Sequence, residues 1–369
     1  MPKPSVASEG PLPYLTSYSG NRRSRRRHQG FTLIQVLIAI GIIGLLSAIL
    51  MGSFRRIRVP VDRNNCDIHL KETVMALDTF RQEKGHLPNS LSELVDNSYI
   101  AASTLRCPAD IGFDEAVKAN PKYTSYSDGY IIREPRDSGE LPIVVCPFHE
   151  KDGPFGAQGF KGGYTKQFTA HNATLPLGSF SGTVTITRPG VGVLNLPTNA
   201  GQPLILRGGD RIKTGAGSAT ISFEDGSTAN IVANSEMSVL QSFTEGQKSG
   251  TLYTLVRQFS GRVNYYVNPT AKSHFDVATP TATAGALGTR FTIDVVRAST
   301  LSTGTTTLSA NEMETVLKVT EHKVALSTNE RTIEVKDTEP AIAAHNPNNI
   351  LKLRLPRVIT DLLNVLGLR

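Results

Sequence analysis

The sequence predicts an α+β chain in which a long N-terminal transmembrane helix packs on a small antiparallel sheet and a separate all-β domain follows. Residues 31–51 are uncharged and almost wholly apolar, apolar residues recur at helical spacing after them, and alternating polar and apolar runs dominate beyond residue 175. The expected segments are a basic leader over 1–30, the helix with its sheet over 31–174, the β domain over 175–340 and a tail over 341–369.

The apolar run predicts a membrane anchor. Roughly 20 apolar residues is the length that an α-helix needs to cross a bilayer. A block of arginines from Arg22 to Arg27 precedes the run, and positive charge keeps its side of a spanning segment in the cytoplasm. We therefore expect a single-pass protein of the cytoplasmic (inner) membrane with its C-terminal body outside the cytoplasm. A conventional secretory signal is disfavoured, because no small-residue cleavage site follows the run.

The positive charge lies mainly in the leader. The chain has a formal net charge of +7, and residues 1–30 hold six lysines and arginines with a single acidic residue, Glu9. We therefore assign the basic balance to membrane targeting and expect no nucleic-acid partner.

The start of the apolar run carries a specific motif. Gly30-Phe-Thr-Leu-Ile-Gln-Val-Leu-Ile-Ala-Ile40 resembles the processing site of type IV pilins and type II secretion pseudopilins. The resemblance implies that a prepilin peptidase cuts after Gly30 and that the new N-terminal Phe31 is methylated. It also implies pilin or pseudopilin subunits as partners and assembly into a pilus-like filament.

Gln35 departs from this pattern. The family has glutamate at the position, where the carboxylate pairs with the amino terminus of a neighbouring subunit. A charge in lipid is costly unless it is paired, so glutamine removes both the cost and the partner. The departure favours a minor or tip subunit, or an anchored chain that does not polymerise.

The segment after the run predicts two helices. Apolar residues at intervals of three and four over 67–84 predict one buried helix face. Pro60 is expected to kink or interrupt this helix, and Gly85 to end it. A helix-start signature predicts a short second helix over 91–95.

Short β-type runs then predict a three- or four-stranded meander that ends near residue 150. The runs are 99–100, 105–110, 123–126, 130–132 and 143–147. Their order resembles the periplasmic region of pseudopilins. The glycine-rich residues 153–174 are expected to be a linker, because no Gly-Lys-Ser/Thr follows to make a phosphate loop. Asp110 and Asp128 lack the clustered carboxylates of a calcium site.

The sequence allows two roles for the cysteines, a disulfide or a metal site. Cys107 and Cys146 both precede proline, and we expect them to pair as a disulfide, which an extracytoplasmic compartment permits. The alternative is a metal site made by Cys66-x-x-His69 and Cys146-x-x-His149 together with Cys107. Because His69 is also explained as an ordinary helix residue and the segments are far apart in sequence, we expect no metal and no cofactor.

From about residue 177 the sequence predicts an all-β domain. Threonine, valine, serine and glycine dominate, and the alternating runs 183–187, 219–223 and 228–232 predict strands. Asp225-Gly226 lies between the last two runs and predicts a hairpin.

Several motifs over roughly residues 178–336 resemble a FecR-type domain. They include Gly209-Asp210-Arg211-Ile212-Lys213-Thr214-Gly215, Asp225-Gly226-Ser227, Gly261-Arg262-Val263 and Gly288-Thr289. Such domains are extracytoplasmic binding modules and not enzymes, best known in regulators that sense an outer-membrane receptor and control a sigma factor. The resemblance implies an envelope protein or glycan as ligand.

We expect the motif residues to be mainly structural. They are Gly209, Asp210, Thr214, Gly215, Asp225, Gly226, Gly261, Gly288 and Thr289. The glycines are expected to permit turns or close backbone approach. Asp210, Asp225 and Thr289 are expected to cap turns through their side chains.

The C-terminal third continues the β pattern. Strands are predicted over 314–320, 323–326 and 332–335, after a flexible serine- and threonine-rich insertion over 299–309. Residues 349–369 predict a short amphipathic helix that docks on the body. No arrangement typical of a hydrolase, metalloenzyme or nucleotide-binding site is present in the sequence, so we expect no enzymatic activity.

Together these features predict a non-enzymatic cell-envelope protein, an anchored pilin- or pseudopilin-like subunit that displays a FecR-type module outside the cytoplasmic membrane. The alternative is a FecR-type transmembrane signalling or sensor protein. Signalling to a sigma factor requires a folded cytoplasmic domain, and residues 1–30 are too short and too rich in proline for one.

Overall fold

The computed structural model describes residues 33–132, 142–149, 157–160, 164–166, 169–170, 173–189, 191–196, 202–244, 252–270, 273–297, 313–329, 332–338 and 342–345. The leader with Gly30 and Phe31, the insertion over 299–309 and the tail helix over 349–369 lie outside these residues. The chain divides into two compact units, Met1–Arg55 and Arg56–Arg369.

Helix α1 (Leu33–Lys84) is 52 residues long and starts in the first unit. There it exposes its large apolar side chains from Leu33, which is 78% exposed, to Leu46, which is 51% exposed. Within the described part of the chain, no helix is both long and apolar enough to cross a membrane. The spanning segment expected over 31–51 is therefore not confirmed. The helix continues through Pro60, so the predicted interruption at that residue is not formed.

In the second unit α1 packs on a small core, as the helical spacing predicts. Leu70, Val74, Leu77 and Phe80 are all buried. The helix ends at Gly85, which has φ 82° and donates its N–H to the Arg81 carbonyl at 2.8 Å. Helix α2 (Ser92–Asp96) follows close to the predicted position.

The predicted meander is wrong for most of its runs. Residues 102–105 form the 3₁₀ helix η1 (Ala102–Leu105), and α3 (Phe113–Ala119) follows. Most of the remaining runs form turns, in which the buried Asp110 carboxylate accepts hydrogen bonds from the hydroxyls of Tyr123 and Ser125 at 3.1 and 2.8 Å. The backbone N–H groups of Asp110 and Ser127 likewise donate within turns, to the carbonyls of Cys107 and Thr124 at 3.0 Å, and not to a neighbouring strand.

A small antiparallel sheet forms instead from β1 (Pro142–Cys146), β2 (Ala157–Phe160) and β3 (Tyr164–Lys166). Two of these strands lie in the glycine-rich stretch that the sequence predicts as a linker. Gly159 shows why glycine is needed in these strands. A Cβ atom there would lie 2.7 Å from Cγ2 of Val74 on α1. The glycines permit close approach to the helix but hide the alternating pattern of a strand.

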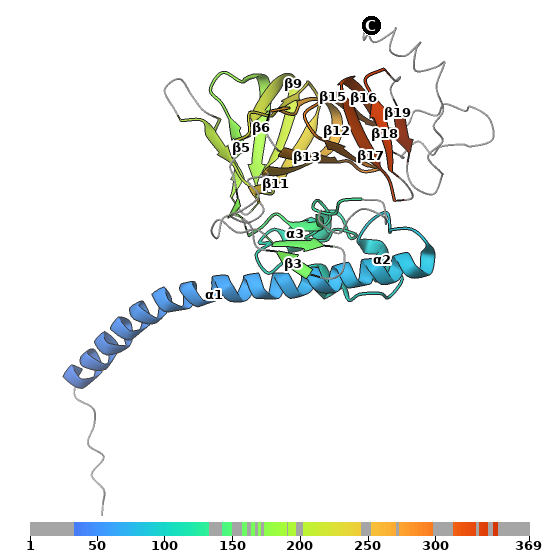
Figure 1. The fold of residues 1–369 in the computed structure, drawn as a ribbon. Helices are drawn as coiled ribbons and strands as arrows, with labels where there is room; N and C mark the ends of the chain where they lie inside the picture. Colours follow the sequence, from blue (N-terminus) through green and yellow to red (C-terminus); the bar gives the residue numbers. More distant parts are fainter. Residues whose placement is uncertain are drawn as a thin grey trace, which may run out of the picture. The chain divides into compact units, whose positions relative to one another are not determined.

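The remaining strands form one all-β body, coloured green to red in Figure 1. They are β4 (Thr169–Ala170), β5 (Ala173–Leu175), β6 (Phe180–Arg188), β7 (Gly192–Val193), β8 (Leu204–Leu206), β9 (Arg211–Ser222), β10 (Thr228–Ile231), β11 (Glu236–Thr244), β12 (Leu252–Tyr266), β13 (Ser273–Ala278), β14 (Thr283–Ala286), β15 (Arg290–Arg297), β16 (Met313–Glu321), β17 (Lys323–Ser327), β18 (Thr332–Lys336) and β19 (Ile342–His345). The predicted hairpin is confirmed, since β9 and β10 pair antiparallel across Asp225-Gly226. Ala219, Ile221 and Phe223 face the core as expected.

Strand β12 is the central element of this body. As far as Ser260 it pairs with β11, and its first residues also pair in parallel with β13. From Gly261 onward it pairs with β15, and from Val263 with β10. The strand thus changes partners at Gly261, whose φ is 77°.

Contacts within the second unit join the small core to the β body. Ile131, Val145, Leu240 and Leu255 form one buried apolar cluster. Nε2 of Gln241 donates to the carbonyl oxygen of Cys146 at 2.9 Å. Both elements therefore share buried apolar and polar contacts.

Phe275 tests the packing of the β core. Its ring is fully buried, with its centroid 5.2 Å from that of Phe223. Phe275→Ala leaves a cavity and is expected to lower the free energy of unfolding of the full chain by about 3–5 kcal/mol in urea denaturation. Leu287→Ala, at a side chain that is 67% exposed, is the matched control and should change it little. Equal losses in both variants would contradict this account of the core.

Candidate functional site

Motif residues from β9 and β12 meet around Ser235, which lies in the turn before β11. The hydroxyl of Thr214 lies 2.6 Å from the Val232 carbonyl and accepts the backbone N–H of Ser235 at 3.0 Å. Oγ of Ser235 lies 3.0 Å from the Arg262 carbonyl and accepts the Arg262 N–H at 2.9 Å. A Cβ atom on Gly261 would lie 2.6 Å from Cα of Ser235. Thr214 and Gly261 therefore fix the turn before β11 against β12.

A second set of motif residues fixes the β9–β10 hairpin. The Asp225 carboxylate accepts both the N–H and the hydroxyl of Ser227 at 2.8 Å, so Asp225 caps the turn as predicted. Nδ2 of Asn268 donates to the Asp225 carbonyl at 2.6 Å. Gly226 has φ 84°, a conformation that favours glycine. The hairpin is thus tied to the end of β12.

Gly288 and Thr289 lie beside that end of β12. A Cβ atom on Gly288 would lie 2.7 Å from Cα of Pro269, so glycine is required for the close approach. The Thr289 carbonyl accepts the N–H of Val267 at 2.8 Å. Its hydroxyl is buried and has no hydrogen-bond partner among the described residues, so the predicted side-chain cap at Thr289 is wrong.

Asp210 combines a turn cap with a buried ion pair. Its carboxylate accepts the N–H of Arg207 at 2.9 Å, which confirms the predicted cap. It also pairs with Nε and Nη2 of Arg188 at 2.8 and 2.7 Å, and it is fully buried. Gly209 precedes it with φ 85° and donates its N–H to the Val239 carbonyl at 2.9 Å. Gly215 lies close to β6, since a Cβ atom there would be 3.3 Å from Cβ of Thr183.

These contacts place the predicted motif residues in three structural clusters. Arg188, Ser235 and Asn268 complete the clusters, and the sequence analysis did not identify them. No spacing rule connects them to their partners, because each contact depends on which strands are neighbours in the sheet. Arg188 and Ser235 come shortly after the predicted strands 183–187 and 228–232, which is the signal that was available for them.

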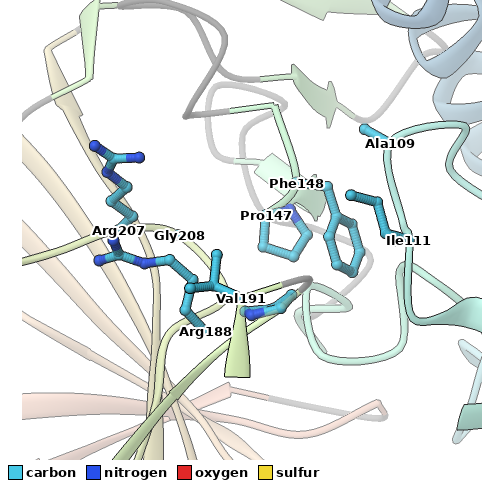
Figure 2. A pocket seen from close by; sticks show the side chains of 9 residues that line it. Ala109, Ile111, Pro147, Phe148, Arg188, Val191, Arg207 and Gly208 are labelled. Carbon is cyan, nitrogen blue, oxygen red and sulfur yellow. The ribbon is translucent and has the colours of Figure 1, made fainter. Parts of the chain in front are cut away.

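A small cavity lies beside the Asp210 cluster. Figure 2 shows Ile111, Pro147 and Phe148 on one side and the Arg188 and Arg207 side chains on the other. Its volume is about 90 Å³, well below the roughly 300–1,000 Å³ of pockets that hold small-molecule ligands. We therefore assign it no ligand.

The three cysteines and one histidine form a separate cluster. The thiol sulfur of Cys107 lies 3.9 Å from that of Cys66, 3.5 Å from that of Cys146 and 3.3 Å from Nε2 of His149. All four residues are buried, and their potential ligand atoms lie within 4.8 Å of one another. The predicted Cys107–Cys146 disulfide is not formed, because all three cysteines are free thiols.

The pKa values of the three thiols are shifted in different directions. Burial raises the pKa of the Cys66 and Cys146 thiols. The pKa of the Cys107 thiol is lowered, because Cys146, Cys66 and His149 all form hydrogen bonds to its sulfur. Cys107 is therefore the thiol at which negative charge is best stabilised.

His69 does not join this cluster, although its spacing from Cys66 matches that of His149 from Cys146. Its Nδ1 lies 2.9 Å from the Arg106 carbonyl oxygen. Of the residues in the predicted metal-site alternative, Cys66, Cys107, Cys146 and His149 therefore come together, and His69 does not.

Comparisons with known proteins agree with both sequence resemblances. Residues 25–51 match the model of the prokaryotic N-terminal methylation motif, and residues 210–324 match that of FecR protein. The chain joins a prepilin-type motif to a FecR-type domain. The matched FecR region contains the Ser235 and Asp225 clusters and begins at Asp210 itself. A search of curated proteins found no match.

Similar solved structures include two crystal structures, at 2.50 and 1.65 Å resolution, of an anti-sigma factor candidate from Parabacteroides distasonis. They are 18% and 16% identical to this chain, and each alignment covers 38% of this chain and 56% of the other. The chain thus spans little more than half the length of those proteins. The TM-score is 0.28 in both cases, which does not establish a shared fold.

Gly261→Ala tests the partner change of β12. Gly178, which has φ 74° and no atom within 4 Å of an added Cβ, is the matched control for backbone strain. Both alanines carry the positive-φ penalty, but only that at position 261 also collides with Ser235 and Asn234. We expect Gly261→Ala to lose about 1–3 kcal/mol more than Gly178→Ala in urea denaturation of the full chain. Equal losses would show that the contact with Ser235 is unimportant.

Asp210→Ala tests the buried ion pair. Removal of the carboxylate leaves the Arg188 guanidinium, which is 18% exposed, without its charge partner. We expect the free energy of unfolding to fall by about 3–5 kcal/mol. Glu334→Ala breaks an ion pair with Lys323 whose side chains are 57% and 60% exposed, and thermal unfolding should hardly change. The interpretation fails if the two variants behave alike.

Proposed function

We propose that this protein is a non-enzymatic envelope protein in which a pilin-like N-terminal helix anchors a FecR-type binding module outside the cytoplasmic membrane. The observation that carries the proposal is the order of the two matched segments in one chain, the methylation motif first and the FecR region second. A prepilin-type motif directs a chain to the envelope, and the FecR region supplies the folded body.

The first unit supports an anchoring role. From Leu33 to Leu46 its helix presents apolar side chains that no described residue covers, and such a surface is stable only in an apolar environment. In this proposal residues 31–51 cross the cytoplasmic membrane once, with the leader in the cytoplasm. A prepilin peptidase cuts after Gly30, and Phe31 becomes the methylated N-terminus.

Gln35 limits the assembly that we propose. It lies in the helix without the carboxylate that pairs with a neighbouring subunit in pilins. The helix therefore holds the β body at the membrane or at a filament tip, next to pilin or pseudopilin subunits, and does not build a long fibre.

The β body supports a binding role and no catalytic one. The side chains of Thr214, Asp225 and Asp210 are hydrogen-bonded in clusters that fix turns and strand partners, which favours a structural role for them. The ligand that we propose is an envelope protein or a glycan. A sensor function in the same compartment is the alternative, and it would require a cytoplasmic partner for the leader.

Processing at Gly30 is the decisive test. The full chain is expressed together with a prepilin peptidase, and the N-terminus of the membrane-fraction protein is determined by mass spectrometry. We expect the wild type to begin at methylated Phe31 and Gly30→Val to retain the leader, because a branched side chain blocks cleavage there. Gly41→Val, which alters a helix glycine with no atom within 4 Å of an added Cβ, should be processed normally.

Two results would count against the proposal. A wild-type chain that still begins at Met1 would refute pilin-type processing, and recovery in the soluble fraction would refute anchoring. Crosslinking of a sigma factor to the retained leader would favour the sensor alternative.

A further inference from the structure

Four buried side chains converge on one point in the second unit. The Cys66 thiol comes from α1, the Cys107 thiol from the segment after η1, the Cys146 thiol from the end of β1 and the His149 imidazole from the turn that follows. These residue types form the ligand set of structural zinc sites with three cysteines and one histidine. The convergence therefore resembles a metal-binding site in composition.

The distances from the Cys107 sulfur also fit such a site. A tetrahedral zinc ion with Zn–S bonds of about 2.3 Å separates two ligand sulfurs by about 3.8 Å, and it separates sulfur from a histidine nitrogen by about 3.6 Å. The observed separations from the Cys107 sulfur are 3.9 and 3.5 Å to the other sulfurs and 3.3 Å to Nε2 of His149. We propose that Cys66, Cys107, Cys146 and His149 bind one zinc ion.

A disulfide explains the cluster less well. A disulfide bond is about 2.05 Å long and involves two cysteines only. It would account for only two of the three thiols at this point. Simple thiol packing, which is common for buried cysteine, would not require His149 to direct Nε2 at the Cys107 sulfur.

The surroundings support a structural metal and not a catalytic one. All four donors come from the protein and all are buried, so a tetrahedral ion would have no open position for water or substrate. The Tyr126 hydroxyl lies 3.4 Å from the Cys66 sulfur and is placed to donate to a thiolate. Such outer contacts orient metal ligands and tune their affinity.

The ion would fasten α1 to the small core. The core around Leu70 and Leu77 is small, and small cores commonly need a metal or a disulfide for stability. Metal ligation would also protect the three thiols from oxidation outside the cytoplasm. The inference does not depend on cleavage at Gly30, because the ligands lie between residues 66 and 149.

Metal analysis of the full chain tests the proposal directly. The protein is purified in detergent without chelator, and zinc is measured by elemental mass spectrometry. We expect one zinc ion per chain and no thiol that reacts with a thiol reagent until a chelator is added. Replacement of zinc by Co²⁺ should give the visible absorption of a tetrahedral, thiolate-rich site.

Variants identify the ligands. Cys66→Ser and His149→Ala should each lower bound zinc at least tenfold, whereas His149→Cys, which restores a fourth donor, should retain it. His69→Ala is the matched control, because it alters the histidine of the other Cys-x-x-His pair and should bind zinc as the wild type does.

The wild-type measurement keeps the proposal falsifiable even if a cysteine variant fails to fold. A chain with no bound zinc that takes up neither Zn²⁺ nor Co²⁺ would overturn it. A Cys107–Cys146 disulfide in the purified wild type, seen as a linked peptide, would overturn it as well. Loss of zinc from His69→Ala with normal binding in His149→Ala would show that the ligand assignment is wrong.

Discussion

The convergence of Cys66, Cys107, Cys146 and His149 is the constraint on which the small core around α1 depends. Cys66 is the first buried residue along the described side chains of α1, so the cluster lies where the helix enters its core. Cys146 ends β1, and its carbonyl oxygen accepts the hydrogen bond of Gln241 from β11. The same short segment therefore contacts the helix through a side chain and the β body through its backbone.

The β body depends on a different constraint, the partner change of β12 at Gly261. A strand that pairs with β11 and β13 over one half and with β10 and β15 over the other needs a backbone conformation that a residue with a Cβ atom does not readily adopt. Thr214 and Ser235 then hold the adjacent turn against this corner. The residues that make the FecR resemblance recognisable are thus those that build the fold.

Much of the β body could be predicted from the sequence, because period-two alternation and the Asp225-Gly226 turn are local signals. The small core around α1 was harder to predict from the sequence. Asp110 is satisfied by hydroxyls from two nearby turns, which gave β-like residues a non-strand conformation. The glycines around Gly159 concealed a strand that must approach Val74 closely. Thr289 failed as a cap because its carbonyl and not its hydroxyl makes the contact.

The choice between His69 and His149 could not be made from spacing at all. Both histidines lie three residues after a cysteine, and only the fold decides which imidazole reaches the sulfurs. On α1 a residue three positions after Cys66 is still its neighbour on the helix surface, yet the His69 imidazole meets the Arg106 carbonyl instead. His149 lies just beyond the end of β1 and outside any helix, so no helical geometry constrains the direction in which its imidazole points. The convergence of these side chains therefore decides how α1 packs against the small core of the second unit.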